Sequence, residues 1–332
     1  MSDRIGVLLM AYGGPSSLAD LPGYLADVRR GRPTPRAILA ELERNYSSIG
    51  GRSPLPTLTQ RQADALSREL NATARSARYA VHVGMRHWSP WIEETVGTML
   101  DAGITHAVSL VLAPHFSAMS VAAYQARIAA GLDAYRGRID FAHVDSYHAE
   151  PALIQAFADR VQEGLARWDE GERDAVHVVF SAHSLPQRIV AAGDPYDRQV
   201  RETAALVAAR AGLDASRWSW SYQSAGRTKE PWLGPTLPDH LAALAKAGVR
   251  NVVSVPVGFV CDHVEILYDI DIEAQARCKE LGIRLERPSA LNDEPLFIEM
   301  LAGLVRRRAA DAGFIGTPAR DTAAAGFAST TI

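Results

Sequence analysis

The stretch VPVGFVCDHVEILYDIDIEAQARC, residues 255–278, opens as an apolar run and continues with apolar residues at helical spacing. A run of β-branched and aromatic residues bounded by Pro and Gly is typical of a strand, whereas a spacing of three and four residues is typical of a helix. The stretch therefore predicts a strand that leads directly into a helix. This is the repeating unit of an α/β protein.

The same alternation extends along the chain. Strands are expected at residues 5–12, 79–85, 106–116, 139–147, 175–183, 217–224, 251–260 and 284–289. Helices are expected at residues 56–72, 91–102, 120–135, 151–168, 198–211, 237–247, 263–281 and 294–310. Because several strands are apolar throughout, they should be covered on both faces, as in parallel sheets. The order predicts two doubly wound, Rossmann-like α/β lobes, each with a four-stranded parallel sheet.

The boundary between the lobes is expected near residue 148. The first lobe then covers residues 1–148 and the second residues 149–293. The last helix, residues 294–312, could pack back across the first lobe. The tail, residues 313–332, has no amphipathic period and is expected to be flexible.

Composition excludes several classes of protein. The 332 residues carry a net charge of −3, which argues against nucleic acid as the main partner. The two cysteines cannot form a disulfide framework or a four-thiolate metal site. No apolar run approaches the ~20 residues of a membrane span, and the first residues lack the basic region of a signal peptide. A cytoplasmic protein without stable membrane insertion is expected.

Nucleotide-binding loops are also missing from the sequence. No GxxxxGK[ST] motif occurs, and the first predicted strand ends in AYGGP rather than in GxGxxG. In parallel sheets, ligands bind beyond the carboxyl ends of the strands. The residues at those ends are imidazoles, aromatics, an arginine and carboxylates, which directs the search for a site to them.

His183 ends an apolar strand in the sequence VVFSAHSLP. A lone histidine here is more often a core residue that is hydrogen-bonded to a loop carbonyl. Its place at a strand end nevertheless favours function, because a neutral imidazole is both a base and a ligand for Fe(II).

The segment Asp262-His-Val-Glu265 has the spacing of a helix cap followed by an acid at the third position. On this interpretation Asp262 caps the helix and Glu265 only satisfies backbone N–H groups. However, Glu265, Asp269 and Glu273 are spaced by four, which places them on one helix face and costs ~0.2–0.5 kcal/mol per pair. A visiting cation would offset this repulsion. A solvated acidic face would also tolerate it, so both interpretations stay open.

Further polar residues lie in loops that could approach one ligand. The loop VRRGRPTPR contains Arg29 and Arg30, and the loop YSSIGGRSPL contains Arg52 and Ser53. Such arginines usually form solvated loops, but a guanidinium also matches the geometry of a carboxylate. Tyr12 follows the first predicted strand, where a tyrosine is more often a packing residue than a ligand. Tyr124 offers a hydroxyl donor early in a predicted helix.

A series of motifs then identifies a family. In chain order they are LLMAYGGP, RRGRPTP, IGGRSPL, LAPHFS, SAHSLP, GDPY, PWLGP and VPVGFVCDHVEILYDID, between residues 5 and 300. With them the chain closely resembles the ferrochelatases, and within these the soluble bacterial branch that metallates coproporphyrin III. The resemblance implies a two-lobed chelatase fold with a porphyrin cleft between the lobes, in which Fe(II) is inserted without ATP.

The resemblance also implies roles for individual residues. His183 and Glu265 would handle the metal and the pyrrole protons, and Tyr12 would be the axial ligand to the product iron. Five positions match propionate-binding residues: Arg29, Arg30, Arg52, Ser53 and Tyr124. Asp269 and Glu273 resemble an outer cation site, in which some relatives have an arginine near the position of Asn45. His87 of MRHWSP is a further candidate ligand.

The expected substrates are coproporphyrin III and Fe(II), and the expected product is Fe-coproporphyrin III. No tightly bound cofactor is expected, and no [2Fe–2S] cluster, because the C-terminal region has no cysteine. A monomer with transient partners in the haem pathway is expected. The alternatives are insertion of iron into protoporphyrin IX, a haem carrier that uses Tyr12 but inserts no metal, and a chelatase for another metal or tetrapyrrole.

Overall fold

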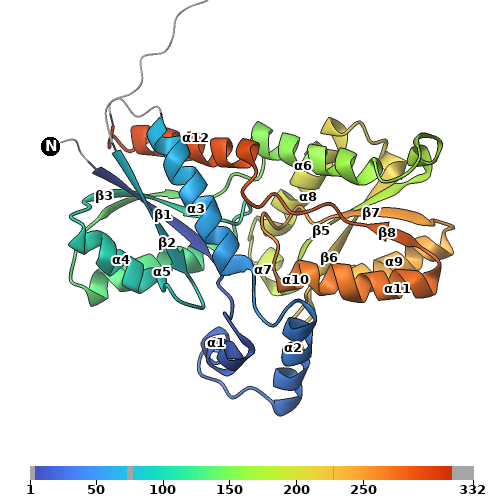
Figure 1. Cartoon of the computed structure of the whole chain (residues 1–332), viewed down its shortest axis with the longest axis horizontal. Coiled ribbons are helices and arrows are strands. Elements are labelled where there is room, and N and C mark those ends of the chain that lie inside the picture. The colour runs from blue at the N-terminus through green and yellow to red at the C-terminus, as the bar shows by residue number, and fades with distance from the viewer. Residues whose placement is uncertain (1–3, 73–77, 227, 316–332) are drawn as a thin grey trace, which may run out of the picture.

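The computed structural model describes residues 4–72, 78–226 and 228–315 of the chain, drawn in Figure 1. Most of the predicted flexible tail, residues 316–332, lies outside the described residues. All eight predicted strands are present. They are β1 (Arg4–Ala11), β2 (Arg78–Met85), β3 (His106–Val111), β4 (Asp140–Val144), β5 (His177–His183), β6 (Trp218–Gln223), β7 (Asn251–Val255) and β8 (Arg284–Glu286).

The strands form two parallel sheets with the same topology. The order is β2-β1-β3-β4 in the first sheet and β6-β5-β7-β8 in the second. Figure 1 shows the sheets side by side, with helices on both faces of each. The prediction of two doubly wound α/β lobes is therefore confirmed.

Eight predicted helical regions are also present, with bounds shifted by a few residues. Seven of them are single helices: α3 (Leu55–Ala72), α4 (Ile92–Asp101), α5 (Val121–Ala134), α6 (Pro151–Leu165), α8 (Tyr196–Arg210), α9 (Leu237–Lys246) and α12 (Pro295–Asp311). The eighth is a composite helix made of α10 (Val264–Leu267), η4 (Asp269–Ala274) and α11 (Gln275–Leu281). The composite helix differs from the prediction, because η4 is a π-helical segment in which the Glu273 N–H donates to the Tyr268 carbonyl at 2.9 Å.

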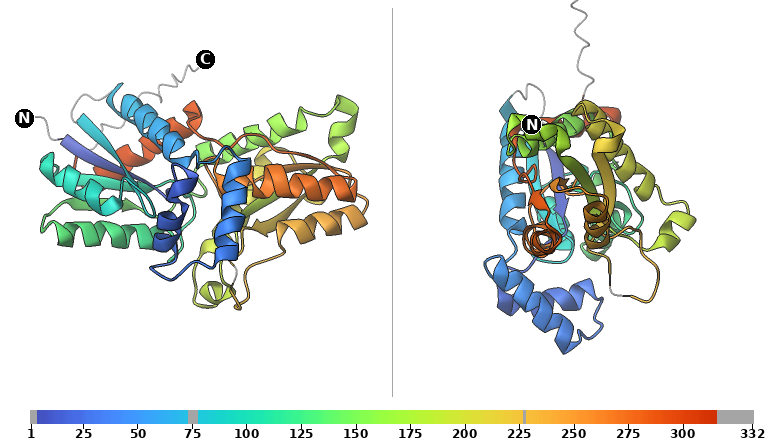
Figure 2. Two further views of the ribbon diagram at one scale, coloured as in Figure 1. Left: turned by 60° about the horizontal axis from the view of Figure 1, so that its bottom comes forward. Right: turned by 90° about the vertical axis from the view of Figure 1, so that its right-hand side faces the viewer.

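Three α-helices of the described residues were not predicted from the sequence: α1 (Leu21–Val28), α2 (Arg36–Ser48) and α7 (Gln187–Ala191). In Figure 1, α1 and α2 project from one side of the molecule at the junction of the lobes, and the right-hand view of Figure 2 also shows them projecting from the rest of the chain. They pack on each other through a small apolar cluster of their own that includes Leu21, Tyr24 and Tyr46. Trp88 and Val264, from the first and second lobes, pack against the same cluster.

The core explains why the strands form. Every residue of β1 except Arg4 is buried, because helices cover the sheet on both faces. The last helix, α12, contacts α3, β3 and β4 of the first lobe and also α6 of the second. Within the described ranges, no helix is both long and apolar enough to cross a membrane.

The topology places two strand ends at special positions. In each sheet the chain order reverses around the first strand of the lobe, between β1 and β3 and between β5 and β7. Ligands of open α/β sheets bind at such switch points. Tyr12 follows β1 directly and His183 ends β5, so both lie at a switch point.

Gly258 allows the turn after β7 to lie against the end of β5. A Cβ atom at this position would lie 2.4 Å from Ala182 Cβ and 2.7 Å from Ala182 Cα. The Gly258 N–H also donates to the Ser181 carbonyl at 3.1 Å. Any side chain at position 258 would push on the backbone that carries His183.

We therefore expect Gly258→Ala to lower the free energy of unfolding by ~1–3 kcal/mol, the usual cost of overpacking. Chemical denaturation would measure the change. Gly171→Ala is the matched control, because a Cβ there meets nothing within 4 Å. Equal stability of the Gly258→Ala variant and the wild type would contradict the close-approach argument.

Candidate active site

His183 stands where β5 ends, and one third of its side chain is exposed (33%). Its Nδ1 atom contacts the Ser184 carbonyl, which can only accept a hydrogen bond. The Nδ1–H therefore donates there, and the Nε2 atom keeps its lone pair. This Nε2 atom lies 3.7 Å from Oε1 of Glu265. His183 thus bonds to a loop carbonyl, as a packing histidine would, and its Nε2 atom is still available to a ligand.

Glu265 lies between two imidazoles. His183 approaches one carboxylate oxygen, and the Nε2 atom of His263 lies 3.5 Å from the other. Burial alone would raise the pKa of Glu265, but the two histidines outweigh it and hold the pKa below its ordinary value. Glu265 is therefore an anion at neutral pH.

His263 was missed as a functional residue. Burial would lower its pKa, but the contact with Glu265 raises it above the ordinary value. Its Nδ1 atom lies 3.0 Å from the Cys261 carbonyl, which directs Nε2 towards Glu265. Residues two apart do not face each other in a helix. His263 can reach Glu265 because its backbone is extended, with φ −159° and ψ −177°.

The expectation that Asp262 caps the helix is wrong. The residue before α10 is His263, and its side chain makes no cap hydrogen bond. The Asp262 carboxylate instead accepts from Arg287 at 3.0 Å and from Asn292 at 2.8 Å. The two partners follow Asp262 by 25 and 30 residues, so local spacing alone could not reveal them.

Gln223 was also missed. Its side-chain oxygen accepts from the Ser181 hydroxyl at 2.8 Å, and its amide donates to the Glu265 carbonyl at 2.6 Å. It thereby ties the backbone of Glu265 to the strand that carries His183. A polar residue at the buried end of an apolar strand is a signal that could have identified it.

The three acids spaced by four residues have different surroundings. Asp269 accepts a hydrogen bond from the Ser224 hydroxyl, and Glu273 is exposed. Burial raises the pKa of Asp269 to about 7, and the charge of Glu265 adds to the shift. Near neutral pH this carboxyl therefore exchanges its proton easily while Glu265 stays ionised.

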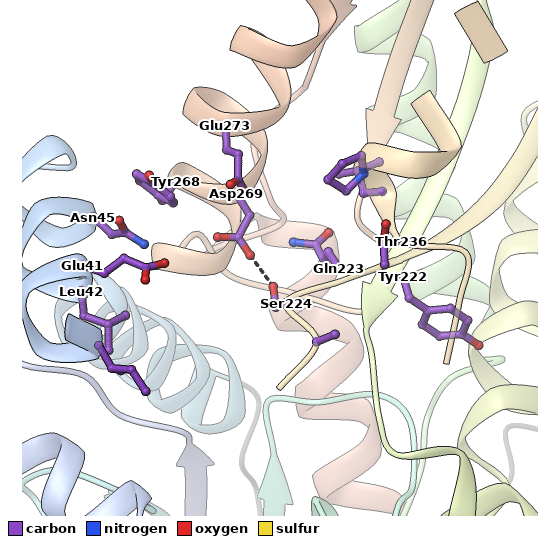
Figure 3. A pocket seen from close by; sticks show the side chains of 14 residues that line it. Glu41, Leu42, Asn45, Tyr222, Gln223, Ser224, Thr236, Tyr268, Asp269 and Glu273 are labelled. Carbon is purple, nitrogen blue, oxygen red and sulfur yellow. Dashed lines mark hydrogen bonds between the residues drawn. The ribbon is translucent and has the colours of Figure 1, made fainter. Parts of the chain in front are cut away.

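Asp269 and Glu273 line a cavity of about 420 Å³ beside the second lobe. Figure 3 shows Asn45 and Glu41 of α2 on the left, across the cavity from the two acids, with Ser224 below Asp269 and Gln223 to its right. Asn45 therefore lies on the same cavity as the two acids. The cavity wall also contains Gln223, which bonds to Glu265, so the cavity borders the segment of the histidine–glutamate pair.

On the first lobe, Tyr12 and His87 form a contact pair with ring centroids 4.5 Å apart. Tyr12 is 39% exposed, whereas His87 is buried. Desolvation by the surrounding protein, together with the charge of Glu265, raises the pKa of Tyr12 to about 12. Burial lowers the pKa of His87 to about 4, although its Nδ1 atom lies 2.6 Å from Asp27. His87 is therefore neutral, its Nδ1–H donates to Asp27, and its ring packs against the ring of Tyr12.

We call Tyr12, His87, His183, His263 and Glu265 the interlobe site. The charge of Glu265 lies close enough to Tyr12 to raise the pKa of its hydroxyl. The described residues contain no group of three or more His, Cys, Asp or Glu side chains arranged to hold a metal ion. The pair His183 and Glu265 can therefore offer two ligands and leave the remaining coordination positions of a metal open.

The candidate propionate residues divide into two groups. Arg30 and Arg52 are exposed, and Arg29 is partly buried with its Nε atom unpaired within the described part of the chain. Arg30 has a left-handed backbone with φ 55°, which is uncommon for arginine.

The other two candidates are buried in packing. Ser53 is 5% exposed and its hydroxyl accepts from the Leu55 N–H at 3.3 Å. Tyr124 is 4% exposed, with the Arg86 guanidinium 5.4 Å above its ring. The arginines are thus better placed to meet an anionic ligand than the two hydroxyl groups.

Comparison with known sequences points to one family. A sequence profile of the ferrochelatases matches residues 4–309. A ferrochelatase of Deinococcus radiodurans is 56% identical over 92% of this chain and 96% of its own. Coproporphyrin III ferrochelatases of Anoxybacillus flavithermus and a Geobacillus species are 43% and 41% identical, each over 92% of this chain and at least 96% of their own.

Comparison with solved structures agrees in fold. The sirohydrochlorin chelatase SirB of Bacillus subtilis, solved with cobalt, superposes with a TM-score of 0.55 at 13% identity. It covers 94% of this chain and 97% of its own. At this identity the likeness concerns the two-lobed architecture alone.

The raised pKa of Asp269 makes a testable prediction about stability. The folded protein holds this proton up to about pH 7, whereas the unfolded chain releases it near 3.8. Stability from this group is therefore lost as the pH rises through that window. We therefore compare the free energies of unfolding of Asp269→Asn and the wild type in the presence of a chelator. From pH 5 to pH 8 the difference should change by ~1 kcal/mol in favour of the variant, allowing for partial exposure of Asp269.

Thermal or chemical unfolding at the two pH values would measure this gain. Glu280→Gln is the matched control, since the Glu280 side chain is 67% exposed and should show no such change. A difference between Asp269→Asn and the wild type that does not change from pH 5 to pH 8 would refute the raised pKa.

Proposed function

Because this chain belongs to the ferrochelatase family, which inserts iron into a porphyrin, we propose that its porphyrin substrate is coproporphyrin III. We further propose that His183 and Glu265 handle the metal and the pyrrole protons. The observation that carries the proposal is the 3.7 Å approach of His183 Nε2 to Glu265 Oε1 at a switch point of the second sheet.

The pair suits the chemistry of metallation. Two pyrrole N–H protons must leave the ring while Fe(II) loses its water ligands and gains four nitrogen ligands. The lone pair of His183 Nε2 can accept a proton or bind Fe(II), and the anionic Glu265 stabilises either positive charge. Two protein ligands hold Fe(II) loosely enough for the ring to take over its coordination.

His263 supports this pair from the side away from His183. Its imidazole, with a raised pKa, keeps Glu265 ionised and directs one carboxylate oxygen. We propose it as a positioning residue of the reaction. The second oxygen of Glu265 remains available to the iron and to His183.

Tyr12 is the proposed axial ligand on the other side of the ring. Its exposed side chain follows β1, and the charge of Glu265 in the opposite lobe contributes to its raised pKa. A tyrosine with a pKa near 12 stays protonated in the free enzyme. It would bind iron only once the metal is in the ring and lowers that pKa.

The preference for coproporphyrin III is supported by two kinds of observation. Several relatives named coproporphyrin III ferrochelatases match nearly their whole length. In addition, Arg29, Arg30 and Arg52 lie in two loops near α1 and α2, where they could bind propionates. Coproporphyrin carries four propionates and protoporphyrin two, so several arginines suit the former. Ser53 and Tyr124 remain candidates for the same role.

Asp269 and Glu273 are the proposed outer cation site, with the cavity beside them as the route to Glu265. Exchange of a proton at Asp269 near pH 7 suits a group that passes protons or cations between solvent and the interlobe site. His87 remains a candidate extra ligand and also supports Tyr12, because its Nδ1–H donates to Asp27 and its Nε2 atom keeps its lone pair. The absence of a resident cofactor, the monomeric state, the cytoplasmic location and haem-pathway partners stay predictions.

We expect His183→Ala to lower kcat for Fe(II) insertion by at least ~100-fold, because it removes both a base and a ligand. Glu265→Gln should lower kcat by ~10–100-fold with little change in porphyrin affinity. Anaerobic absorbance assays with coproporphyrin III, together with porphyrin titration by fluorescence, would separate the two quantities. Normal turnover by both variants would exclude the proposed pair, and a wild-type protein that binds porphyrin but inserts no metal would favour a haem carrier.

Substrate choice is tested by comparing coproporphyrin III and protoporphyrin IX side by side. Coproporphyrin III should have the higher kcat/KM. Arg29→Ala should lower that value by ~10-fold, about one charge-assisted hydrogen bond, and should affect protoporphyrin IX less. Arg44→Ala is the control, since Arg44 is an exposed arginine on the same pair of helices. Equal rates with both porphyrins, or a higher rate with protoporphyrin IX, would support the alternative substrate.

A further inference from the structure

Arg287, which follows β8, bonds to two aspartates on either side of Glu265. Its Nε and Nη2 atoms donate to the two oxygens of Asp271, each at 2.6 Å. Its Nη1 atom donates to Asp262 at 3.0 Å and to the Pro288 carbonyl at 2.9 Å. The side chain is only 9% exposed, so these contacts are shielded from water.

Asn292 engages the same aspartate from the other side. Its amide nitrogen donates to the second oxygen of Asp262 at 2.8 Å, and its amide oxygen accepts from the Asp262 N–H at 2.9 Å. The Asn292 carbonyl accepts from Gln62 of α3 at 2.8 Å. The backbone of Asn292 is left-handed, with φ 49°, as these contacts require.

These contacts form a clamp, which we define as Arg287 and Asn292 with their partners Asp262 and Asp271. The segment held by the clamp contains His263, Glu265 and Asp269. It has few restraints of its own, because α10 has four residues and no side-chain cap. Beyond α10 the chain continues as a π-helical segment. Such segments are rare in proteins, and those that occur are often found at functional sites.

A buried ion pair is weak evidence for stability, since apolar residues of similar volume often stabilise a fold equally well. The contacts of Arg287 are better explained by their effect on the position of the segment that carries Glu265. The single contact with Asp262 and the bidentate contact with Asp271 fix two points, three residues before and six residues after Glu265. A guanidinium suits this task because its planar fork has a defined orientation.

We propose that Arg287, assisted by Asn292, is a positioning residue that holds Glu265 at its working distance from His183. This inference rests on the proposed role of Glu265. Gln223 fixes the backbone of Glu265 from the β5 side, and the clamp fixes the segment from the β8 side. The clamp also occupies Asp271, which separates this acid from Asp269 and Glu273 at the cavity.

The first test is the kinetics of Arg287→Met. Displacement of a reacting group by about 1 Å can cost ~100-fold, so kcat for Fe(II) insertion should fall by ~10–100-fold. The dissociation constant for coproporphyrin III should stay within about twofold, because the clamp does not touch the proposed propionate loops. Arg287→Lys should recover only part of the rate, since an ammonium cannot bind Asp271 through a planar fork.

Two further variants keep the test valid if Arg287→Met folds poorly. Asp271→Asn retains Arg287 and weakens only the bidentate contact, so kcat should fall by severalfold. Arg284→Met is the matched control, because Arg284 of β8 bonds to Glu286 and the Arg167 carbonyl and lies away from the clamp. Its kcat should equal that of the wild type.

A double-mutant cycle separates positioning from general damage. If Arg287 acts through Glu265, Arg287→Met should cost little additional rate in a Glu265→Gln background. A full, multiplicative loss in that background would overturn the inference, as would wild-type kcat in folded Arg287→Met and Asp271→Asn proteins. If Glu265→Gln itself turns over normally, the proposed role of Glu265 fails, which is a different result.

Discussion

The parallel pairing of β5 with β7 determines where the reactive groups can lie. Residues 177–180 of β5 pair with residues 252–255 of β7, so both strands end at the same edge of the sheet. Beyond the last pair the two chains separate, and the Gly258 N–H still reaches the Ser181 carbonyl. The segment that follows β7 therefore turns over the end of β5. The 3.7 Å approach between His183 and Glu265 depends on this arrangement.

The eight strands and most long helices could be predicted because each has a local cause. Apolar runs give strands, and helical spacing gives helices, within a few residues of the observed bounds. Helix α2 was missed because its sequence follows an arginine- and proline-rich loop and buries only Tyr46. The π-helical segment was missed because its apolar spacing, read over residues 263–281, is that of an ordinary helix.

The site was predictable only in part. His183 and Glu265 occupy positions that strand ends and family motifs identify, and the structure brings them together. The cap at Asp262 was a wrong prediction because a distant arginine and asparagine compete for its carboxylate. The link from Gln223 to Glu265 joins residues 42 positions apart. Local spacing carries no information on such partners, which only the folded chain brings together.

The acids spaced by four residues show how different surroundings give the carboxyl groups of one motif different pKa values. Glu265 lies between two imidazoles, so its pKa is lowered despite burial. Asp269, one turn further, has a serine hydroxyl as its partner, and burial together with the Glu265 charge raises its pKa to about 7. A cation that enters the row would therefore displace a proton at Asp269 but meet a ready anion at Glu265. On the proposed roles, Glu265 and His183 would supply two ligands to the iron, so that porphyrin nitrogens could replace the protein at the metal.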